Sequence, residues 1–375
     1  MSTLTAYRDL FPICNSRLFL NHAAIASPSL RVVERMNACM VECAEQGARN
    51  ESQWNQGLDK IRCDAAKLMG AKAEDIALVS NTSTGLSLIA AAFPWRTGDA
   101  VLVPVPDFPS NIHPWTNLGR LGVQVIPVPR REGRIDCRDF ARALKPGVRM
   151  VTLSSVNYVN GAAADLEEIG AFCREKGLFF VVDAIQSLGA LPVDVGRAGI
   201  HALAAGGHKW LLGPMGSAIL YLNHDFRRLL HPPLVGWKSM QDSDEFSEKF
   251  QLRDDAAAFE PGTPAWATLF GLGAALELLA EIGTETVRSR IFARCDEFIT
   301  GLQARDIKIH SPLGPPERSG ILSFSPPGTP ERVFQALRAQ GVELSLRQGL
   351  LRISPHFYNS SRDVSTFFDT LATIL

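Results

Sequence analysis

The stretch LFFVVDAIQS, residues 178–187, decides the fold. Five apolar residues run directly into Asp183. A short apolar run of this kind is typical of a strand buried on both faces, as in a parallel sheet. Open α/β sheets bind ligands beyond the carboxyl ends of their strands, so Asp183 and Gln186 are candidate binding residues. Taken alone, Asp183 has an alternative role as the cap of a following helix.

Similar apolar runs alternate with helical patterns on both sides of this stretch. Strands are predicted at 75–80, 100–106, 123–129, 149–156, 178–184, 201–207 and 216–222, and helices at 58–70, 83–93 and 165–177. Strands that alternate with helices indicate an α/β fold around a mainly parallel sheet.

The remainder of the chain has a different pattern. Residues 232–264 combine prolines, glycines and mixed charge, which predicts an irregular segment. Two long helices are expected at 267–283 and 287–305, and short strands (320–325, 349–354) then alternate with helices (330–341, 364–375). We therefore expect two domains with a boundary near residue 275, the second of them a small α+β unit.

A single lysine, Lys209, lies in the apolar, glycine-flanked run AAGGHKWLLGPMG, residues 204–216. Apolar surroundings lower the pKa of a lysine and make it a nucleophile that can form a Schiff base. The alternative is a surface lysine whose stem covers apolar neighbours.

Two further features follow predicted strands. VSNTSTGLSL, residues 79–88, is a hydroxyl-rich turn that leads into a helix, as in phosphate sites at helix N-termini, although an ordinary helix cap has the same pattern. VPDFPSNIHPW, residues 105–115, places Phe108 in a turn, where its ring could stack on a flat cofactor or simply pack in the core. A phosphate turn, a ring, an acid and a lysine together meet the needs of pyridoxal 5′-phosphate (PLP).

DAIQS followed by GGHKWLLGPMG resembles the class V aminotransferase family of fold-type I PLP-dependent enzymes, which includes cysteine desulfurases, kynureninases and isopenicillin N epimerases. The resemblance extends from LFLNHAAIASPS (18–29) to LLRISPHFYNS (350–360). It implies a large PLP-binding domain, residues 18–275, with a mainly parallel seven-stranded sheet, and a small domain formed by residues 1–17 and 276–375. It also implies PLP as cofactor and a homodimer with active sites at the interface.

The resemblance implies a role for each matching residue. Lys209 would form the Schiff base with PLP, and Asp183 would pair with the pyridinium nitrogen. The other implied cofactor contacts are Gln186 at the phenolic oxygen, Phe108 and Tyr158 at the ring, and Thr82, Ser83, His208 and the partner subunit's Thr263 at the phosphate. The implied substrate contacts are Arg352 at the α-carboxylate and the loop formed by Asn21, His22 and Ala23.

Two departures from the cysteine desulfurases matter. Those enzymes carry a cysteine on a mobile loop shortly before the carboxylate-binding arginine, whereas SLRQGLLRIS, residues 345–354, has no cysteine and no room for a long loop. They also carry a stacking histidine where this chain has Phe108. The sequence therefore predicts an enzyme that is not a persulfide-forming cysteine desulfurase.

The activity predicted first is class V aminotransferase chemistry on an amino acid, through an external aldimine, because it needs only Lys209 as the base. A C–S lyase that works by α,β-elimination and an isopenicillin N epimerase-like enzyme stay open as alternatives. The epimerase needs a second acid, for which Tyr158 or His22 could serve. A non-catalytic PLP-binding module is the hypothesis from another class, and the presence of Lys209, Asp183 and Arg352 argues against it.

Composition excludes other classes. The 38 basic and 39 acidic residues nearly cancel, which gives no sign of a nucleic acid or anionic membrane partner. There is no glycine fingerprint for a dinucleotide and no metal-ligand spacing. The seven cysteines are scattered without a CxxC pair, and no apolar stretch is long enough to cross a bilayer. We expect a cytoplasmic protein whose partner is a small-molecule amino acid.

Overall fold

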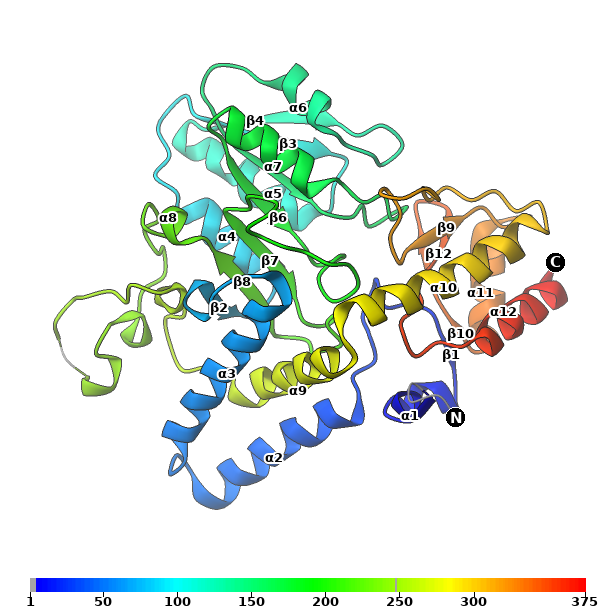
Figure 1. Ribbon diagram of the computed structural model, residues 1–375, viewed down its shortest axis with the longest axis horizontal. Helices are drawn as coiled ribbons and strands as arrows, with labels where there is room; N and C mark the ends of the chain where they lie inside the picture. The colour runs from blue at the N-terminus through cyan, green and yellow to red at the C-terminus, as the bar shows by residue number, and fades with distance from the viewer. Residues whose placement is uncertain (1–4, 247) are drawn as a thin grey trace.

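A seven-stranded sheet forms the centre of the larger of two lobes in the computed structural model, which describes residues 5–246 and 248–375 (Figure 1). Its strand order is β2-β8-β7-β6-β5-β3-β4, and all pairs are parallel except those of β8. The strands are β2 (Ile76–Val79), β3 (Ala100–Val105), β4 (Gln124–Pro129), β5 (Val148–Ser154), β6 (Phe179–Asp183), β7 (Ala202–Gly206) and β8 (Ala218–Leu222). The predicted α/β fold with a mainly parallel seven-stranded sheet is confirmed.

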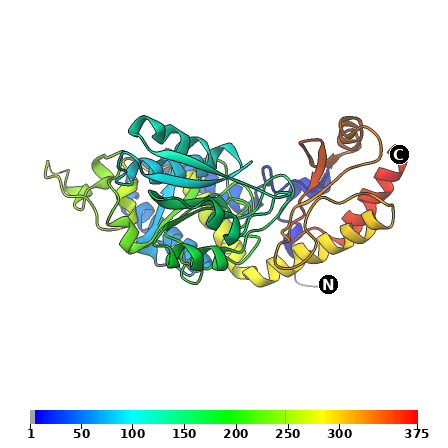
Figure 2. The ribbon, with the colours of Figure 1, turned by 90° about the horizontal axis from the view of Figure 1, so that it is seen from above.

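Side chains that alternate along each strand belong to two different apolar clusters. On β6, Phe180 and Val182 join one cluster and Val181 joins the other, because successive side chains of a strand point to opposite faces. Helices cover both faces of the sheet (Figure 2). In the larger lobe they are α2 (Leu30–Gln46), α3 (Glu51–Met69), α4 (Thr82–Ala92), α5 (His113–Thr116), α6 (Cys137–Ala143), α7 (Leu166–Glu175), α8 (His224–Arg227) and α9 (Trp266–Ile282).

The two N-terminal helices of the larger lobe differ from the prediction. The helix predicted at 58–70 begins earlier, at Glu51, and α2 was not predicted. Only Val32 and Cys39 of α2 are buried, against α9, whereas Met40 and Val41 are exposed. The apolar residues of α2 are too few and too exposed to produce a clear helical pattern.

The smaller lobe is built on a three-stranded antiparallel sheet in the order β11-β12-β9. A short parallel pair joins β1 near the N-terminus to β10, so the segment that begins at Leu18 lies with the small lobe. The elements are α1 (Thr5–Arg8), β1 (Leu18–Phe19), α10 (Thr284–Gln303), β9 (Leu322–Phe324), α11 (Pro330–Ala339), β10 (Val342–Glu343), β11 (Ser345–Arg347), β12 (Leu350–Ile353) and α12 (Ser361–Ile374).

The predicted domain boundary near residue 275 falls inside α9, which continues to Ile282. The chain then bends by 82° at Gly283 into α10, which crosses to the small lobe (Figure 1). The domain ranges stay a prediction, and residues 1–4 of the predicted small domain lie outside the described residues. Within the described part of the chain, no single helix is long and apolar enough to cross a membrane. One bent pair, α9 and α10 taken together, meets the same test on length and composition alone.

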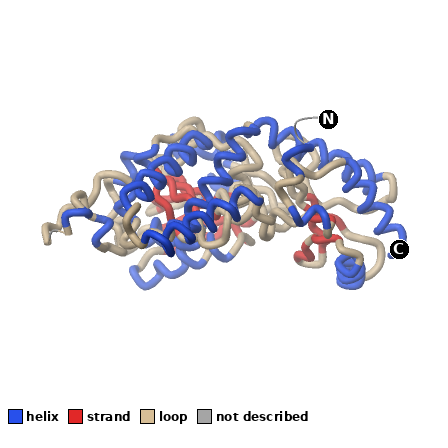
Figure 3. Tube along the Cα trace, turned by 90° about the horizontal axis from the view of Figure 1, so that it is seen from below, coloured by secondary structure: helices blue, strands red, loops and turns tan. Residues whose placement is uncertain are grey.

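The middle of the segment 232–264, which was predicted to be irregular, forms an arm that extends away from the sheet (Figures 1 and 3), whereas Ala256–Phe259 is buried against β2. The described residues of this segment form short 3₁₀ turns at Trp237–Ser239, Ser243–Glu245 and Ala256–Phe259, and an isolated antiparallel bridge pairs Met240 with Leu252. Other 3₁₀ turns occur at Pro12–Asn15, Ala73–Asp75, Pro109–Asn111 and Asn117–Leu121.

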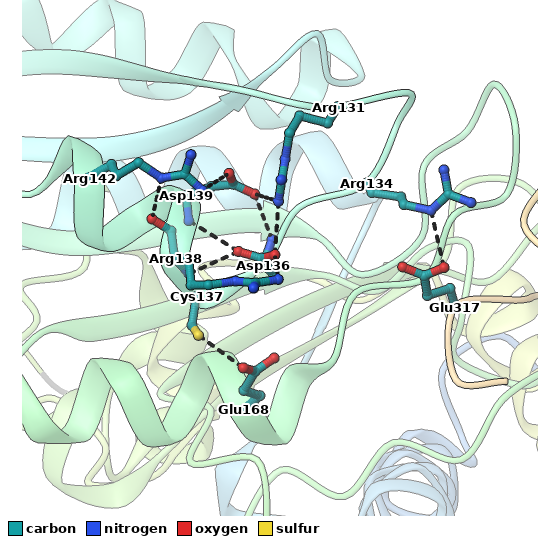
Figure 4. A network of polar contacts seen from close by, with 9 residues as sticks. All are labelled: Arg131, Arg134, Asp136, Cys137, Arg138, Asp139, Arg142, Glu168 and Glu317. Carbon is teal, nitrogen blue, oxygen red and sulfur yellow. Dashed lines mark hydrogen bonds and ion pairs between the residues drawn. The ribbon is translucent and has the colours of Figure 1, made fainter. Parts of the chain in front are cut away.

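A polar network joins α6 to its neighbours (Figure 4). Asp136 and Asp139 form a reciprocal capping box at the start of α6, and Arg131 binds both carboxylates. Arg134 forms an ion pair with Glu317 of the small lobe, 3.1 Å between Nε and Oε2. Exposed ion pairs contribute little stability, so this one orients the two lobes weakly at most.

Candidate active site

The residues predicted to act chemically meet at the carboxyl end of the sheet. Asp183 is the last residue of β6, and Lys209 follows the neighbouring strand β7 by three positions. Lys209 lines a pocket of about 310 Å³ together with Gln186, Phe108 and Arg352, and with Ala23, Thr82, Ser110, Tyr158, His208 and Arg347 among the other lining residues. The pocket therefore collects side chains from both lobes.

Lys209 is a buried amine with no hydrogen bond or ion pair to any described residue. Burial, together with the positive charges of Arg352 and Arg347, lowers the pKa of Lys209 to about 8, and the charge of Asp183 opposes the shift. The Nζ atom lies 5.6 Å from the centre of the Phe108 ring. A neutral amine is therefore accessible near neutral pH, which Schiff-base formation requires.

Asp183 carries a buried acceptor that the described residues leave unsatisfied. Its Oδ1 accepts the N–H of Ile185 at 3.0 Å, but its Oδ2 has no partner. Burial raises the pKa of Asp183 to about 7. The protonated pyridine nitrogen of PLP is a donor of the right kind for Oδ2, and its positive charge would favour the ionised carboxylate. The residues present therefore fit this cofactor.

Gln186 is held in place from both ends of its amide. Its Nε2 donates to the carbonyl of Ala23 at 2.9 Å, and its Oε1 accepts the indole N–H of Trp210 at 2.9 Å. Because a primary amide has two N–H groups, one remains for the phenolic oxygen of PLP. Ala23, predicted to contact substrate, lines the pocket next to Gln186.

Two aromatic rings form one wall of the pocket. Phe108 and Tyr158 are in T-shaped contact, with 5.3 Å between ring centres and 78° between their planes. Phe108 is 39% exposed, which leaves a face of its ring available for stacking. The carboxylate of Asp107 accepts the N–H of Phe108 and forms a buried ion pair with Arg130, and these contacts fix the turn.

The predicted phosphate turn forms the N-terminus of α4. Asn81 caps the helix by accepting the N–H of Thr84, which leaves the N–H groups of Thr82 and Ser83 without intrahelical partners. The hydroxyl of Thr82 accepts the N–H of Gly206 at 2.9 Å. Free N–H groups at a helix N-terminus suit a phosphate, as expected for this turn.

Ser83 and His208 lie beside this turn. Ser83 contacts the hydroxyl of Ser110, a pocket residue, at 2.6 Å between oxygens. His208 lines the pocket, and burial together with Lys209 lowers its pKa. Ser110 was not predicted, although the sequence places it two positions after Phe108 in the same turn.

Arg352 is a buried guanidinium without a carboxylate partner among the described residues. It is 1% exposed, donates from Nη1 to the carbonyl of Tyr158, and leaves Nε unsatisfied. Burial, together with the smaller effect of the charge of Arg347, lowers the pKa of Arg352 to about 9. An incoming carboxylate would supply the missing acceptor and the missing charge.

Arg347 is a pocket residue that sequence reasoning missed. It lies on β11, which pairs with β12 through a two-residue turn formed by Gln348 and Gly349, both at positive φ. Alternation on the two strands of such a hairpin places Arg347 on the same face as Arg352. The short Gln-Gly turn in the sequence was the signal that could have revealed it.

Five predicted site residues are not among those that line this pocket: Asp183 and Ser83, which lie beside it as described above, and His22, Asn21 and Thr263. His22 is fully buried, with Nδ1 2.8 Å from the carbonyl oxygen of Ser354 and Nε2 2.6 Å from the hydroxyl of Tyr358. Asn21 accepts a hydrogen bond from Ser345 at 2.6 Å. Thr263 lines a separate hollow together with Thr84 and Ser80, beside α4. Both nitrogens of His22 are therefore occupied, and Thr263 is not brought to the pocket of its own chain.

A lysine and an acid at neighbouring strand ends of an open α/β sheet are the arrangement of fold-type I PLP-dependent enzymes, and this chain is one of them. A family model described as aminotransferase class-V matches residues 18–367. The chain therefore belongs to the class V aminotransferase family and is an enzyme that uses PLP.

Known relatives cover nearly the whole chain. A probable cysteine desulfurase of Pyrococcus abyssi is 27% identical over 98% of this chain and 96% of its own length. The uncharacterized aminotransferase YcbU of Bacillus subtilis is 26% identical, with the same two coverages. Among solved structures, the cysteine desulfurase of Thermococcus onnurineus has a TM-score of 0.89 at 25% identity, covering 98% and 97% of the two chains. The cystine C-S lyase C-DES, solved with cysteine persulfide, has a TM-score of 0.91 at 24% identity and covers 97% and 99%.

Proposed function

We propose that the enzyme acts on an amino acid and transfers its amino group, as an aminotransferase. Arg352 binds the α-carboxylate, which holds Cα above Lys209. The neutral amine of Lys209 removes the proton from Cα of the amino acid and then holds that proton for the return step that completes the transfer. Bound PLP supplies a pyridinium ring that withdraws the electron pair from Cα, and Asp183 keeps that ring protonated.

The observation that separates this proposal from desulfurase activity is the two-residue turn between β11 and β12. It contains no cysteine, and no cysteine lines the pocket among the described residues. A persulfide-forming desulfurase needs a cysteine thiolate that reaches the sulfur of the substrate. The same turn leaves little room for a mobile loop, so the proposal excludes that activity although several relatives are named for it.

Two alternatives use the same pocket. A C–S lyase needs the same base, Lys209, and differs only in a leaving group on the β-carbon of the substrate. An epimerase needs a second acid on the opposite face of Cα. The engagement of both nitrogens of His22 disfavours that residue as the acid and leaves Tyr158. These placements favour the transferase and the lyase over the epimerase.

A panel of amino acids with the PLP-loaded enzyme tests this proposal. We expect one amino acid to yield its 2-oxo acid, with transfer of nitrogen to an added 2-oxo acid acceptor and without free ammonia. Pyruvate released together with ammonia would replace the transferase by the lyase. Sulfide produced through an enzyme-bound persulfide would contradict the exclusion of desulfurase activity. Lys209→Ala is the control that should fold, bind PLP without a Schiff base, and turn nothing over.

We also propose a homodimer, in the cytoplasm as the scattered thiols suggest. Large apolar side chains near the arm are unusually exposed, including Met215 at 66%, Leu234 at 57%, Phe246 at 78% and Phe250 at 72%. Several large exposed apolar side chains in one region support a protein interface. In this dimer, Thr263 at the base of the arm contacts the phosphate of the PLP that the partner subunit binds.

A further inference from the structure

The pocket contains one positively charged side chain more than is needed to bind the cofactor and an α-carboxylate. Lys209, Arg347 and Arg352 line it, and no aspartate or glutamate is among its lining residues. Lys209 is committed to PLP and Arg352 to the α-carboxylate, while the N-terminus of α4 takes the phosphate. Arg347 forms no ion pair with any described residue, and its only hydrogen bond goes to the carbonyl of the preceding Leu346.

The register of the hairpin makes this surplus charge part of the pocket. Ser345 pairs with Arg352 and Arg347 with Leu350, so the two arginines are diagonal neighbours on one face. Diagonal neighbours on paired strands lie roughly 7–8 Å apart, which long side chains can span. Two like charges on one face repel, and burial keeps Arg352 from being screened by water. An anion that contacts both guanidinium groups would relieve that repulsion.

We propose that Arg347 binds a second anionic group at the end of the substrate side chain, so that the site selects amino acids with an acidic side chain. This inference rests on the proposed function, since it assigns Arg352 to the α-carboxylate. The two-residue turn is essential to it, because Gln348 and Gly349 leave Arg347 at a defined position beside Arg352. A guanidinium at that position suits a side-chain carboxylate.

Binding of unreactive acids to the PLP-loaded enzyme tests the inference without catalysis. Titration calorimetry would compare a dicarboxylate, such as glutarate, with valerate, a monocarboxylate of the same chain length. We expect the dicarboxylate to bind about tenfold more tightly, since a hydrogen-bonded charge pair contributes about 1.5 kcal/mol or more. Arg347→Gln should remove the difference and leave valerate binding unchanged, whereas Arg347→Lys should restore part of it.

Arg332→Gln is the matched control, because it removes one exposed arginine from the same lobe, on α11, and should keep the difference. Equal affinities of the two acids in the unaltered enzyme would overturn the inference. So would Arg347→Gln weakening both acids by the same factor, since both arginines would then share one carboxylate. A protein that takes up no PLP would instead contradict the proposed function, which keeps the two failures distinguishable.

Discussion

Lys209 and Asp183 illustrate how burial prepares single residues for chemistry. Burial lowers the pKa of the amine and raises that of the carboxylic acid, because both charged forms lose water. The neutral forms of both groups are therefore favoured, and Oδ2 of Asp183 has no hydrogen-bond donor among the described residues. Lys209 likewise has no hydrogen-bond partner among the described residues, and both features are expected of groups kept for a cofactor.

The lowered pKa of Lys209 predicts how cofactor loading depends on pH. Only the neutral amine attacks the aldehyde of PLP, so the rate of Schiff-base formation should rise about tenfold per unit below pH 8 and level off above it. Stopped-flow absorbance on the apoenzyme between pH 7 and 10, where the phosphate stays doubly charged, measures this rate. A rate that keeps rising through pH 10 would mean that Lys209 retains an ordinary pKa near 10.5.

At the scale of elements, the close approach of α4 to β7 positions the phosphate turn. Gly85 lies against β7, where an added Cβ would come within 2.9 Å of the Cβ of Ala204. Gly85→Val should push α4 outward, lower the free energy of unfolding by about 1–3 kcal/mol, and weaken PLP binding. Denaturant unfolding and PLP titration measure the two effects.

Ser87→Ala on the exposed side of α4 is the control and should change neither quantity by much. Loss of stability in Gly85→Val with unchanged PLP affinity would show that the packing of α4 does not position the turn. Unchanged stability would show that the helix accommodates the side chain.

At the scale of the whole molecule, the arm predicts a dimer. The PLP-loaded protein should sediment at about twice 40.9 kDa at micromolar concentration. Leu234→Asp places a charge in the exposed apolar surface next to Thr263 and should favour the monomer and weaken PLP retention. Leu121→Asp changes a similarly exposed leucine elsewhere and should not. A PLP-loaded monomer of the unaltered chain would contradict the dimer and the role of Thr263.

Much of the fold and part of the site could be predicted from the sequence. Each of the seven predicted strands overlaps an observed one, and all except the more exposed β4 are mostly buried strands, which appear as continuous apolar runs. The helix α2 was not predicted, because its apolar face is narrow and partly exposed. Lys209, Asp183 and Gln186 could be proposed as site residues because each is a polar residue shortly after an apolar strand, whereas Arg352 was proposed through the family resemblance.

Other residues depend on packing that the sequence does not express. His22 was expected to contact substrate, yet its ring turns into the core, where Ser354 and Tyr358 occupy both nitrogens. These partners lie more than 300 positions away in the chain, and no local pattern predicts such a contact. Arg347 was missed for the opposite reason, since its role depends on the register of a hairpin that only the paired strands define.

The sequence by itself determined the class of this protein: the α/β sheet, the lysine and acid at neighbouring strand ends, and the absence of a cysteine before Arg352. These are local patterns, in which hydrophobic periodicity and residue chemistry act over a few positions. The tertiary structure alone decided which cations share the pocket, which histidine is structural and which acceptor lacks a donor. Burial and register bring together residues that are distant in the chain, and the charge balance of the pocket depends on that assembly.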